Sequence, residues 1–194
     1  METPRPMPFI WLVLVLLAGC ANGLTVAPTE TPPPTSPPPT IETFTACGFT
    51  IVHPSNFVPD EPSTQVMFQS TDDPFSWAII QLRRRAADEI NLPLPDLAVN
   101  LQIKHFPTLA EPPTNAFVFT APDGQRLRGM QSDVIHDDLH TRLLTLLRPN
   151  GVLQDGQRAD VIYEIVFETP QVVWSVWEPL FETMMQTFQP TDCP

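Results

Sequence analysis

Apolar residues between about residue 48 and the C-terminus recur at the periods of strands and helices in turn. Alternation with a period of two favours strands, because successive side chains of a strand point to opposite faces of a sheet. Proline, aspartate and glycine between neighbouring runs predict turns, and therefore antiparallel hairpins. On this pattern we expect seven strands, over residues 48–53, 65–70, 75–84, 116–120, 125–134, 140–148 and 160–168.

A helical period follows the first hairpin. Residues 95–105 place Leu97 and Leu101 on one face, and Pro95 is acceptable because the first helical turn leaves backbone N–H groups unpaired. Prolines at 107, 112 and 113 predict that the helix ends before them.

A second helix is predicted near the C-terminus. Ser175 and Glu178 have the spacing of a capping box, which puts Pro179 in the first helical turn. The following apolar residues have helical spacing and form a stripe that can pack on a sheet: Trp177, Leu180, Phe181, Met184 and Phe188. The elements together predict an α+β fold, an antiparallel sheet of about six to seven strands flanked by helices.

The order of these elements resembles the PsbP and Mog1-like group, an α/β/α sandwich. The resemblance is carried by the opening Gly-Phe-Thr-Ile-Val-His-Pro at 48–54, by the hairpins, and by a last strand at 160–167 that leads into a helix ending at Phe188. It implies a non-catalytic scaffold that acts in assembly or binding. No catalytic residue is carried over from it.

Residues 1–19 have the three parts of an export signal: a polar start with Arg5, an apolar run over 9–18, and small residues at the end. The run is shorter than the roughly 20 residues that cross a membrane. Leu17-Ala18-Gly19-Cys20 resembles the lipobox of bacterial lipoproteins. That resemblance implies cleavage before Cys20, a diacylglyceryl group on its thiol, and a further acyl chain such as palmitate on the new amino terminus.

On this prediction the protein is anchored to the cell membrane on its extracytoplasmic side, with Cys20 as the lipid attachment site and no other cofactor. The alternative is an ordinary cleaved signal with a chance cysteine.

Residues 20–45 are rich in proline and threonine, and such a segment favours extended polyproline II. We expect it to be a tether, because it lacks the basic residues that would suggest a ligand of an SH3-like domain.

Residues 46–194 are expected to form a single globular domain, bracketed by Cys47 and Cys193. Outside the cytoplasm two such cysteines can be oxidised, and domain termini often lie close together, so we predict a disulfide between them.

The formal net charge of the chain is −12, with a single lysine, Lys104. This charge disfavours nucleic acid as a partner and leaves an extracytoplasmic protein as a possible one.

The segment His136-Asp137-Asp138-Leu139-His140 is the candidate for a divalent metal site, with Asp133 as a further ligand. The two imidazoles can converge if the segment is a turn. In a regular strand they would lie about 13 Å apart, too far for one ion. The alternative is a polar hairpin turn whose charges face water.

Arg83-Arg84-Arg85 is the basic cluster of this acidic chain. Alternate residues of a strand share a face, so Arg83 and Arg85 can together hold an anion, with Arg126 or Arg128 on a neighbouring strand. The alternative, which we favour, is that they end an edge strand and pair with nearby acidic residues.

Motifs of common enzymes are absent from the sequence: a glycine-rich phosphate loop, Gly-x-Ser-x-Gly and His-Glu-x-x-His. We therefore expect a non-enzymatic binding or accessory protein. Two alternatives stay open, a metal-binding protein that uses His136 and His140, and a hydrolase that uses Ser132 or Ser175 with a distant histidine.

Overall fold

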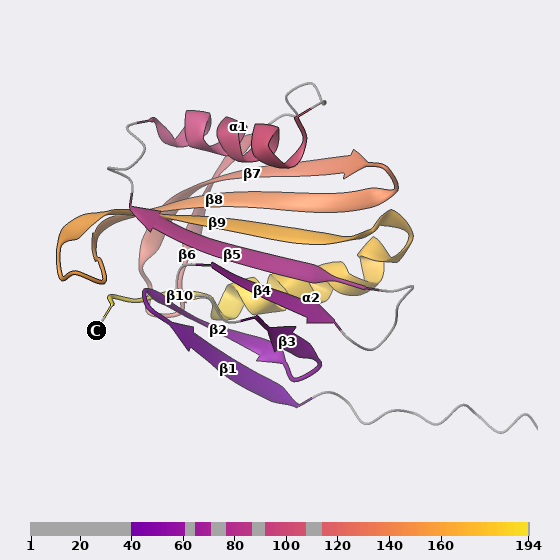
Figure 1. Cartoon of the computed structure of the whole chain (residues 1–194), viewed down its shortest axis with the longest axis horizontal. Coiled ribbons are helices and arrows are strands. Elements are labelled where there is room, and N and C mark those ends of the chain that lie inside the picture. The colour runs from indigo at the N-terminus through magenta and orange to yellow at the C-terminus, as the bar shows by residue number, and fades with distance from the viewer. Residues whose placement is uncertain (1–39, 61–64, 71–76, 87–91, 108–113, 194) are drawn as a thin grey trace, which may run out of the picture. The chain divides into compact units, whose positions relative to one another are not determined.

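The computed structural model describes residues 40–60, 65–70, 77–86, 92–107 and 114–193. The predicted signal, the lipobox with Cys20, most of the tether and the turn at 71–74 lie outside these residues. The described part is α+β, with a large antiparallel sheet flanked by helices, as predicted (Figure 1). Its seven strands, in spatial order, are β3 (Phe57–Pro59), β4 (Gln65–Ser70), β5 (Ile79–Ala86), β9 (Arg158–Pro170), β8 (Leu139–Val152), β7 (Arg126–His136) and β6 (Asn115–Thr120).

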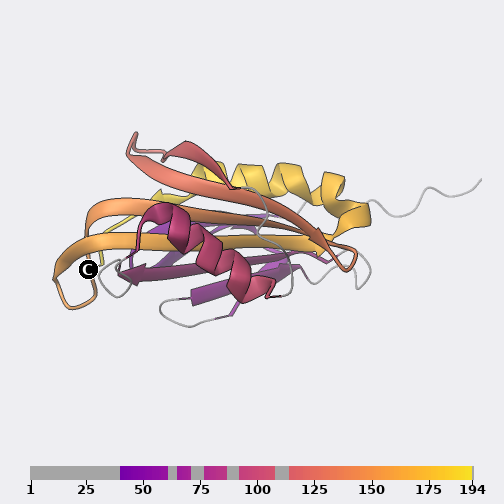
Figure 2. The ribbon, with the colours of Figure 1, turned by 90° about the horizontal axis from the view of Figure 1, so that it is seen from above.

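The two faces of the large sheet are covered differently. Helix α1 (Leu94–His105) packs on one face over β7 and β8, where Leu101, Val134 and Leu143 form a small apolar cluster. The other face holds the main core. It is covered by helix α2 (Trp174–Thr187) and by a small antiparallel sheet of β1 (Ile41–Ala46), β2 (Phe49–Pro54) and β10 (Gln189–Pro190). Figure 2 shows α1 and α2 on opposite sides of the sheet.

The expected hairpins are present. β4 pairs with β5, β6 with β7, and β8 with β9, all antiparallel. β7 and β8 are also joined directly, through the two-residue turn Asp137-Asp138, and both aspartates have positive φ angles, 48° and 64°. Aspartate is one of the few residues that tolerate this conformation, which matches the twist of the strands that the turn connects.

Three strands were not predicted. β1 begins at Ile41, within residues that we assigned to the tether, and pairs along its whole length with β2. β3 and β10 are three and two residues long, too short for periodicity to show. β1 was missed because its composition continues that of the tether, with threonines at outward positions and only Phe44 and Ala46 packed against the core. Among the described residues, no helix is long and apolar enough to span a membrane.

The predicted start of α2 was wrong. The helix begins at Trp174, after a short 3-10 turn at Gln171–Val173, and it has no side-chain cap. Ser175 is therefore its second residue, and Pro179 lies inside it. Trp174 is 8% exposed and packs against Phe181, so tertiary packing extends the helix past the local capping signal. The stripe itself faces the core as predicted: Phe181, Met184 and Phe188 are at most 1% exposed.

Candidate functional site

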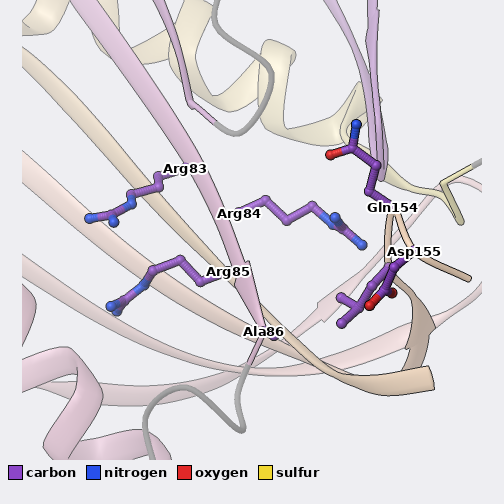
Figure 3. A pocket seen from close by; sticks show the side chains of 7 residues that line it. Arg83, Arg84, Arg85, Ala86, Gln154 and Asp155 are labelled. Carbon is purple, nitrogen blue, oxygen red and sulfur yellow. The ribbon is translucent and has the colours of Figure 1, made fainter. Parts of the chain in front are cut away.

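The arginines of β5 line an open groove of about 400 Å³. Because side chains alternate along the strand, Arg83 and Arg85 point to the face that bears α1, and Arg84 points to the opposite face (Figure 3). Leu153, Gln154 and Asp155, from the turn between β8 and β9, complete the lining. Two of the three positive charges of β5 therefore lie on one face of the sheet, and the third lies on the other face.

Arg83 and Arg85 pair with an acidic residue inside the sheet. Glu164, directly across from Arg83 on β9, is 5% exposed; Arg85 donates to its carboxylate, and Nη1 of Arg83 lies 4.0 Å from Oε2. This pairing agrees with the favoured alternative, in which the arginines pair with nearby acidic residues. The prediction that they end an edge strand was wrong, because β5 lies between β4 and β9.

The prediction that Arg126 or Arg128, on a neighbouring strand, joins these arginines in holding an anion was also wrong. Both lie on β7, and β9 and β8 separate that strand from β5. An anion at Arg83 and Arg85 would have to compete with Glu164. Anion binding there stays a prediction.

Arg84 is a buried residue that the sequence analysis did not single out. It is 7% exposed, its Nη2 donates to the Val152 carbonyl at 2.8 Å, and its Nη1 lies 3.8 Å from Cys47 Sγ. The sequence does contain a signal for this burial, because Arg84 follows Ile80 and Leu82 at a period of two. The guanidinium therefore joins the end of β5 to the last residue of β8 and lies beside Cys47, near the start of the domain.

The predicted disulfide between Cys47 and Cys193 is present, and its Cα atoms are 4.6 Å apart. Beside it, the hydroxyl of Tyr163 donates to the Gly48 carbonyl at 2.8 Å, and the Thr191 amide donates to the same oxygen at 2.9 Å. Burial raises the pKa of Tyr163, and the guanidinium groups of Arg148 and Arg84 offset part of that rise. We call this region the disulfide corner.

A second arginine secures the C-terminal segment of the disulfide corner. Arg148 donates to the Thr191 carbonyl, and its Nη2 donates to Asp192 at 2.8 Å. Asp192 also accepts the Val152 amide at 3.0 Å, and this backbone hydrogen bond is the main reason that its pKa is lowered. The disulfide corner is thus held by one covalent bond and a set of charge-assisted hydrogen bonds, which are the stronger kind.

The two histidines of the candidate metal segment point to opposite faces of the sheet. His136 stands opposite Leu139, and His140 stands opposite Ile135, so the β7–β8 register separates their side chains. His136 contacts Phe106 after α1, and His140 stacks on Trp174 of α2. The described residues contain no group of three or more histidine, cysteine or acidic side chains that could hold a metal ion.

The expected partnership of Asp133 with His140 exists, but as part of an ion-pair network. His140 Nε2 lies 3.4 Å from Asp133, and Nε of Arg142 donates to the same carboxylate at 2.8 Å. Arg142 also donates to Glu178 of α2 at 2.7 Å and lies over the Trp174 ring. The network therefore ties β7 and β8 to α2. Sequence reasoning missed Arg142, because nothing local marks its distant partner Glu178.

This network predicts an acid-sensitive contribution to stability. Burial raises the pKa of Asp133, but hydrogen bonds from Gln131 and Arg142 outweigh burial, so the pKa lies below its ordinary value. A carboxyl whose pKa is lower in the folded state stabilises the fold above its unfolded pKa of about 3.9, and this stabilisation is lost as pH falls through the folded pKa.

Arg142→Met is therefore expected to lower the free energy of unfolding by about 1–3 kcal/mol at pH 7, with the loss shrinking below about pH 4. Urea denaturation at a series of pH values measures both quantities. Asp133→Asn is the control, because it should reduce the acid dependence while leaving the contact between Arg142 and Glu178 in place. An equal loss at every pH for Arg142→Met would contradict the role of Asp133.

The serines considered for hydrolase chemistry lie apart from each other. Ser132 is 2% exposed and its hydroxyl accepts a hydrogen bond from Gln102 of α1, while Ser175 is exposed near the start of α2. Within the described part of the chain, neither hydroxyl is hydrogen-bonded to a histidine. A nucleophile needs such a base within hydrogen-bond reach, so the described geometry offers no support for the hydrolase alternative.

Fold and site together define an α+β sandwich that is closed by a disulfide. No protein-family model and no curated protein matches the chain. Solved structures similar to it include a cyanobacterial PsbP (CyanoP) from Synechocystis sp. PCC 6803, at 13% identity over 84% of this chain and 99% of that one, with a TM-score of 0.45. A PsbP protein is therefore among the solved structures that are similar to this chain.

Two further structures are similar to this chain. LpqN of Mycobacterium tuberculosis, a protein involved in cell envelope biogenesis, matches at 13% identity over 82% of this chain and 87% of that one, with a TM-score of 0.44. A structure from Bacteroides thetaiotaomicron VPI-5482 matches at 11% identity over 77% of this chain, with a TM-score of 0.40. The chain spans about half of that protein, 48%. At these identities the likeness concerns the fold and not an activity.

Proposed function

We propose that this protein is a lipid-anchored lipoprotein of the extracytoplasmic membrane surface, whose α+β domain is a non-catalytic binding or accessory module. In this proposal Cys20 carries the lipid, the proline-rich segment after it is the tether, and the domain meets its partner outside the cytoplasm. The anchor fixes where the domain works, and the domain supplies the binding surface.

The observation that carries the proposal is the bridge between Cys47 and Cys193. Structural disulfides persist in oxidising compartments and are rare in the cytosol. The bridge therefore supports export, and export is what the lipobox ending at Cys20 requires. The two features lie in separate parts of the chain, so they support the location independently.

The accessory part of the proposal is supported by how the polar groups are used. Arg84, Arg148 and Tyr163 are engaged in holding the disulfide corner, and Arg142 holds the ion-pair network. These side chains bind backbone carbonyls and carboxylates of the protein itself, including Arg84 and Arg142, which border a groove and a pocket, so their polar groups are already engaged within the fold.

The intact mass of the protein extracted from membranes tests the anchor. We expect a chain that begins at Cys20 and carries added acyl groups, and a gain of about 2 Da on reduction as one disulfide opens. Cys20→Ala is the matched control, since it should remove the added mass and the membrane association while keeping the bridge. An unmodified chain that still begins at Met1 would refute the proposed anchor.

A further inference from the structure

Strand β6 ends the large sheet and leaves one side of its backbone unpaired among the described residues. It pairs only with β7, over the six residues from Asn115 to Thr120. Figure 2 shows β6 at the margin of the sheet, beside α2. An edge strand offers a row of backbone donors and acceptors to which another extended chain can pair.

Proteins normally protect such edges, and the other described edges of this protein have the usual devices. β3 is three residues long and ends in Pro59, β10 ends in Pro190, and β1 carries Glu42. β6 has none of them, because its sequence Asn-Ala-Phe-Val-Phe-Thr contains no charge and no proline. Its Val118 side chain is 51% exposed. β6 is thus an unprotected edge strand, whereas the other described edge strands have features that hinder pairing with another chain.

An apolar pocket of about 170 Å³ lies next to this edge, on the face that bears α2. Its apolar lining comes from Phe117 and Phe119 of β6 and from Leu144, Phe167, Phe181 and Met185, and the side chains of Gln131, Arg142 and Glu182 complete it. Gly129 of β7 lets Phe117 lie close to the sheet, since a Cβ there would come within 2.6 Å of the phenylalanine ring. A dry apolar cavity of about 150 Å³ can hold benzene, so this pocket has room for one aromatic or branched side chain.

Two arginines stand on the opposite face of the same edge. Arg128 is opposite Val118 and Arg126 is opposite Thr120, and both arginines are exposed. Neither makes an ion pair within the described residues. Local positive charge in a chain of net charge −12 marks this edge as complementary to carboxylates.

We propose that β6 is a docking edge for an extended, acidic segment of a partner protein, which adds a strand to the large sheet. Successive side chains of the added strand point to opposite faces. An apolar side chain of the partner then enters the pocket lined by Phe117 and Phe119, while the next one, a glutamate or aspartate, lies on the face of Arg126 and Arg128.

The reach of the side chains fits this arrangement. Strands lie about 4.8 Å apart, so the added strand is about 10 Å from β7, a gap that an arginine and a glutamate can bridge across β6. A second copy of this chain fits less well, because two copies with a net charge of −12 repel each other and two β6 strands would bring four arginines to one edge. The backbone supplies affinity, while the pocket and the charges supply specificity.

The proposal rests on the proposed accessory function, because it names the binding surface that such a function requires. The intact-mass experiment tests the anchor, and the experiment below tests the edge, so either can fail without the other. The probe is a short synthetic peptide in which phenylalanine and leucine alternate with glutamate. A matched peptide has lysine in place of every glutamate. Binding to the full chain is measured by calorimetry and mapped by amide chemical shifts of β6.

N-methyl groups on the glutamate peptide test strand addition directly. In an added strand, alternate amides point towards β6 and the others point to solvent. Methylation of the inward set is expected to weaken binding by about tenfold or more, and methylation of the outward set is expected to leave it within about twofold. Equal effects of the two patterns, or no binding of the parent peptide, would overturn the proposal.

Charge reversal in the protein tests the second part. The double variant Arg126→Glu, Arg128→Glu is expected to bind the glutamate peptide about three- to tenfold more weakly and the lysine peptide more tightly. Lys104→Glu with Arg158→Glu is the control, because it changes the net charge equally at other surfaces. Equal weakening in the two double variants would refute the charge pairing. Concentration-dependent shifts of the β6 amides without peptide would assign the edge to a second copy instead.

Discussion

Gly48→Ala is expected to lower the free energy of unfolding by about 2–5 kcal/mol, the sum of a backbone and a steric cost. Gly48 has a φ angle of +96°, which an L-residue adopts at a cost of about 1–2 kcal/mol. A Cβ would also stand 2.2 Å from Nε of Arg84 and 2.5 Å from its Cδ. Arg84 cannot move away without giving up the Val152 carbonyl, and an unpaired buried group costs about 1–3 kcal/mol.

Gly124→Ala separates the two costs. Gly124 also has a positive φ angle, +84°, but apart from its two chain neighbours no residue has an atom within 4 Å of the position that its Cβ would take. It should therefore lose only the backbone part, about 1–2 kcal/mol. Urea denaturation of both variants measures the difference, and equal losses would show that the Arg84 contact is unimportant. In an Arg84→Ala background, Gly48→Ala should lose less than it does alone, because the clash is gone.

Removal of the bridge by Cys47→Ser with Cys193→Ser is expected to cost about 4–5 kcal/mol, the second large effect. In the chain-entropy model a cross-link that closes a loop of about 100 residues contributes about 4.7 kcal/mol at 25 °C. The two cysteines are 146 positions apart, so this bridge closes a longer loop. The hydrogen bond from Thr191 to Gly48 would remain, as would those that Asp192 accepts from Arg148 and Val152. These bonds determine how far the disulfide corner keeps its structure without the bridge.

Reductant provides the comparison for this variant. The native chain in excess thiol should unfold at the same urea concentration as the double serine variant, and the variant itself should not respond to thiol. Cys20→Ala should leave the free energy of unfolding unchanged, because that position lies before the domain. Equal stability of the oxidised native chain and the double variant would contradict a stabilising role for the bridge.

Local sequence patterns were sufficient to predict most of the large sheet. Residues such as Leu127 and Ile165 alternate with polar neighbours, and the turns between strands contain residues that adopt positive φ angles. β2 of the small sheet was predicted, but its two partners were missed, because β1 has the composition of the tether before it and β10 is a two-residue strand that forms only by pairing with β2. The start of α2 was misplaced for a related reason, since burial of Trp174 outweighed the cap that Ser175 offered.

The candidate sites were less predictable than the fold. The pairing of Cys47 with Cys193 followed from their positions at the two ends of the domain, and the structure contains it. The separation of His136 from His140 depended on the register of one hairpin, in which a shift of one residue reverses every side chain. The roles of Arg84 and Arg142 depend on partners that are distant in sequence, Val152 and Glu178, which a single sequence does not identify.

The disulfide corner has a mechanical consequence. Tension applied to the chain before Cys47 and after Cys193 passes through the bridge, and every residue between the two cysteines is shielded from it. Of the described strands, only β1 lies outside this covalent loop on the N-terminal side, so under such tension β1 can separate from β2 while the residues within the loop carry no load. A pull between the two ends of the chain would therefore lengthen the tether by one strand and then stop at the bridge, and the docking edge at β6, which lies within the covalent loop, would carry no load.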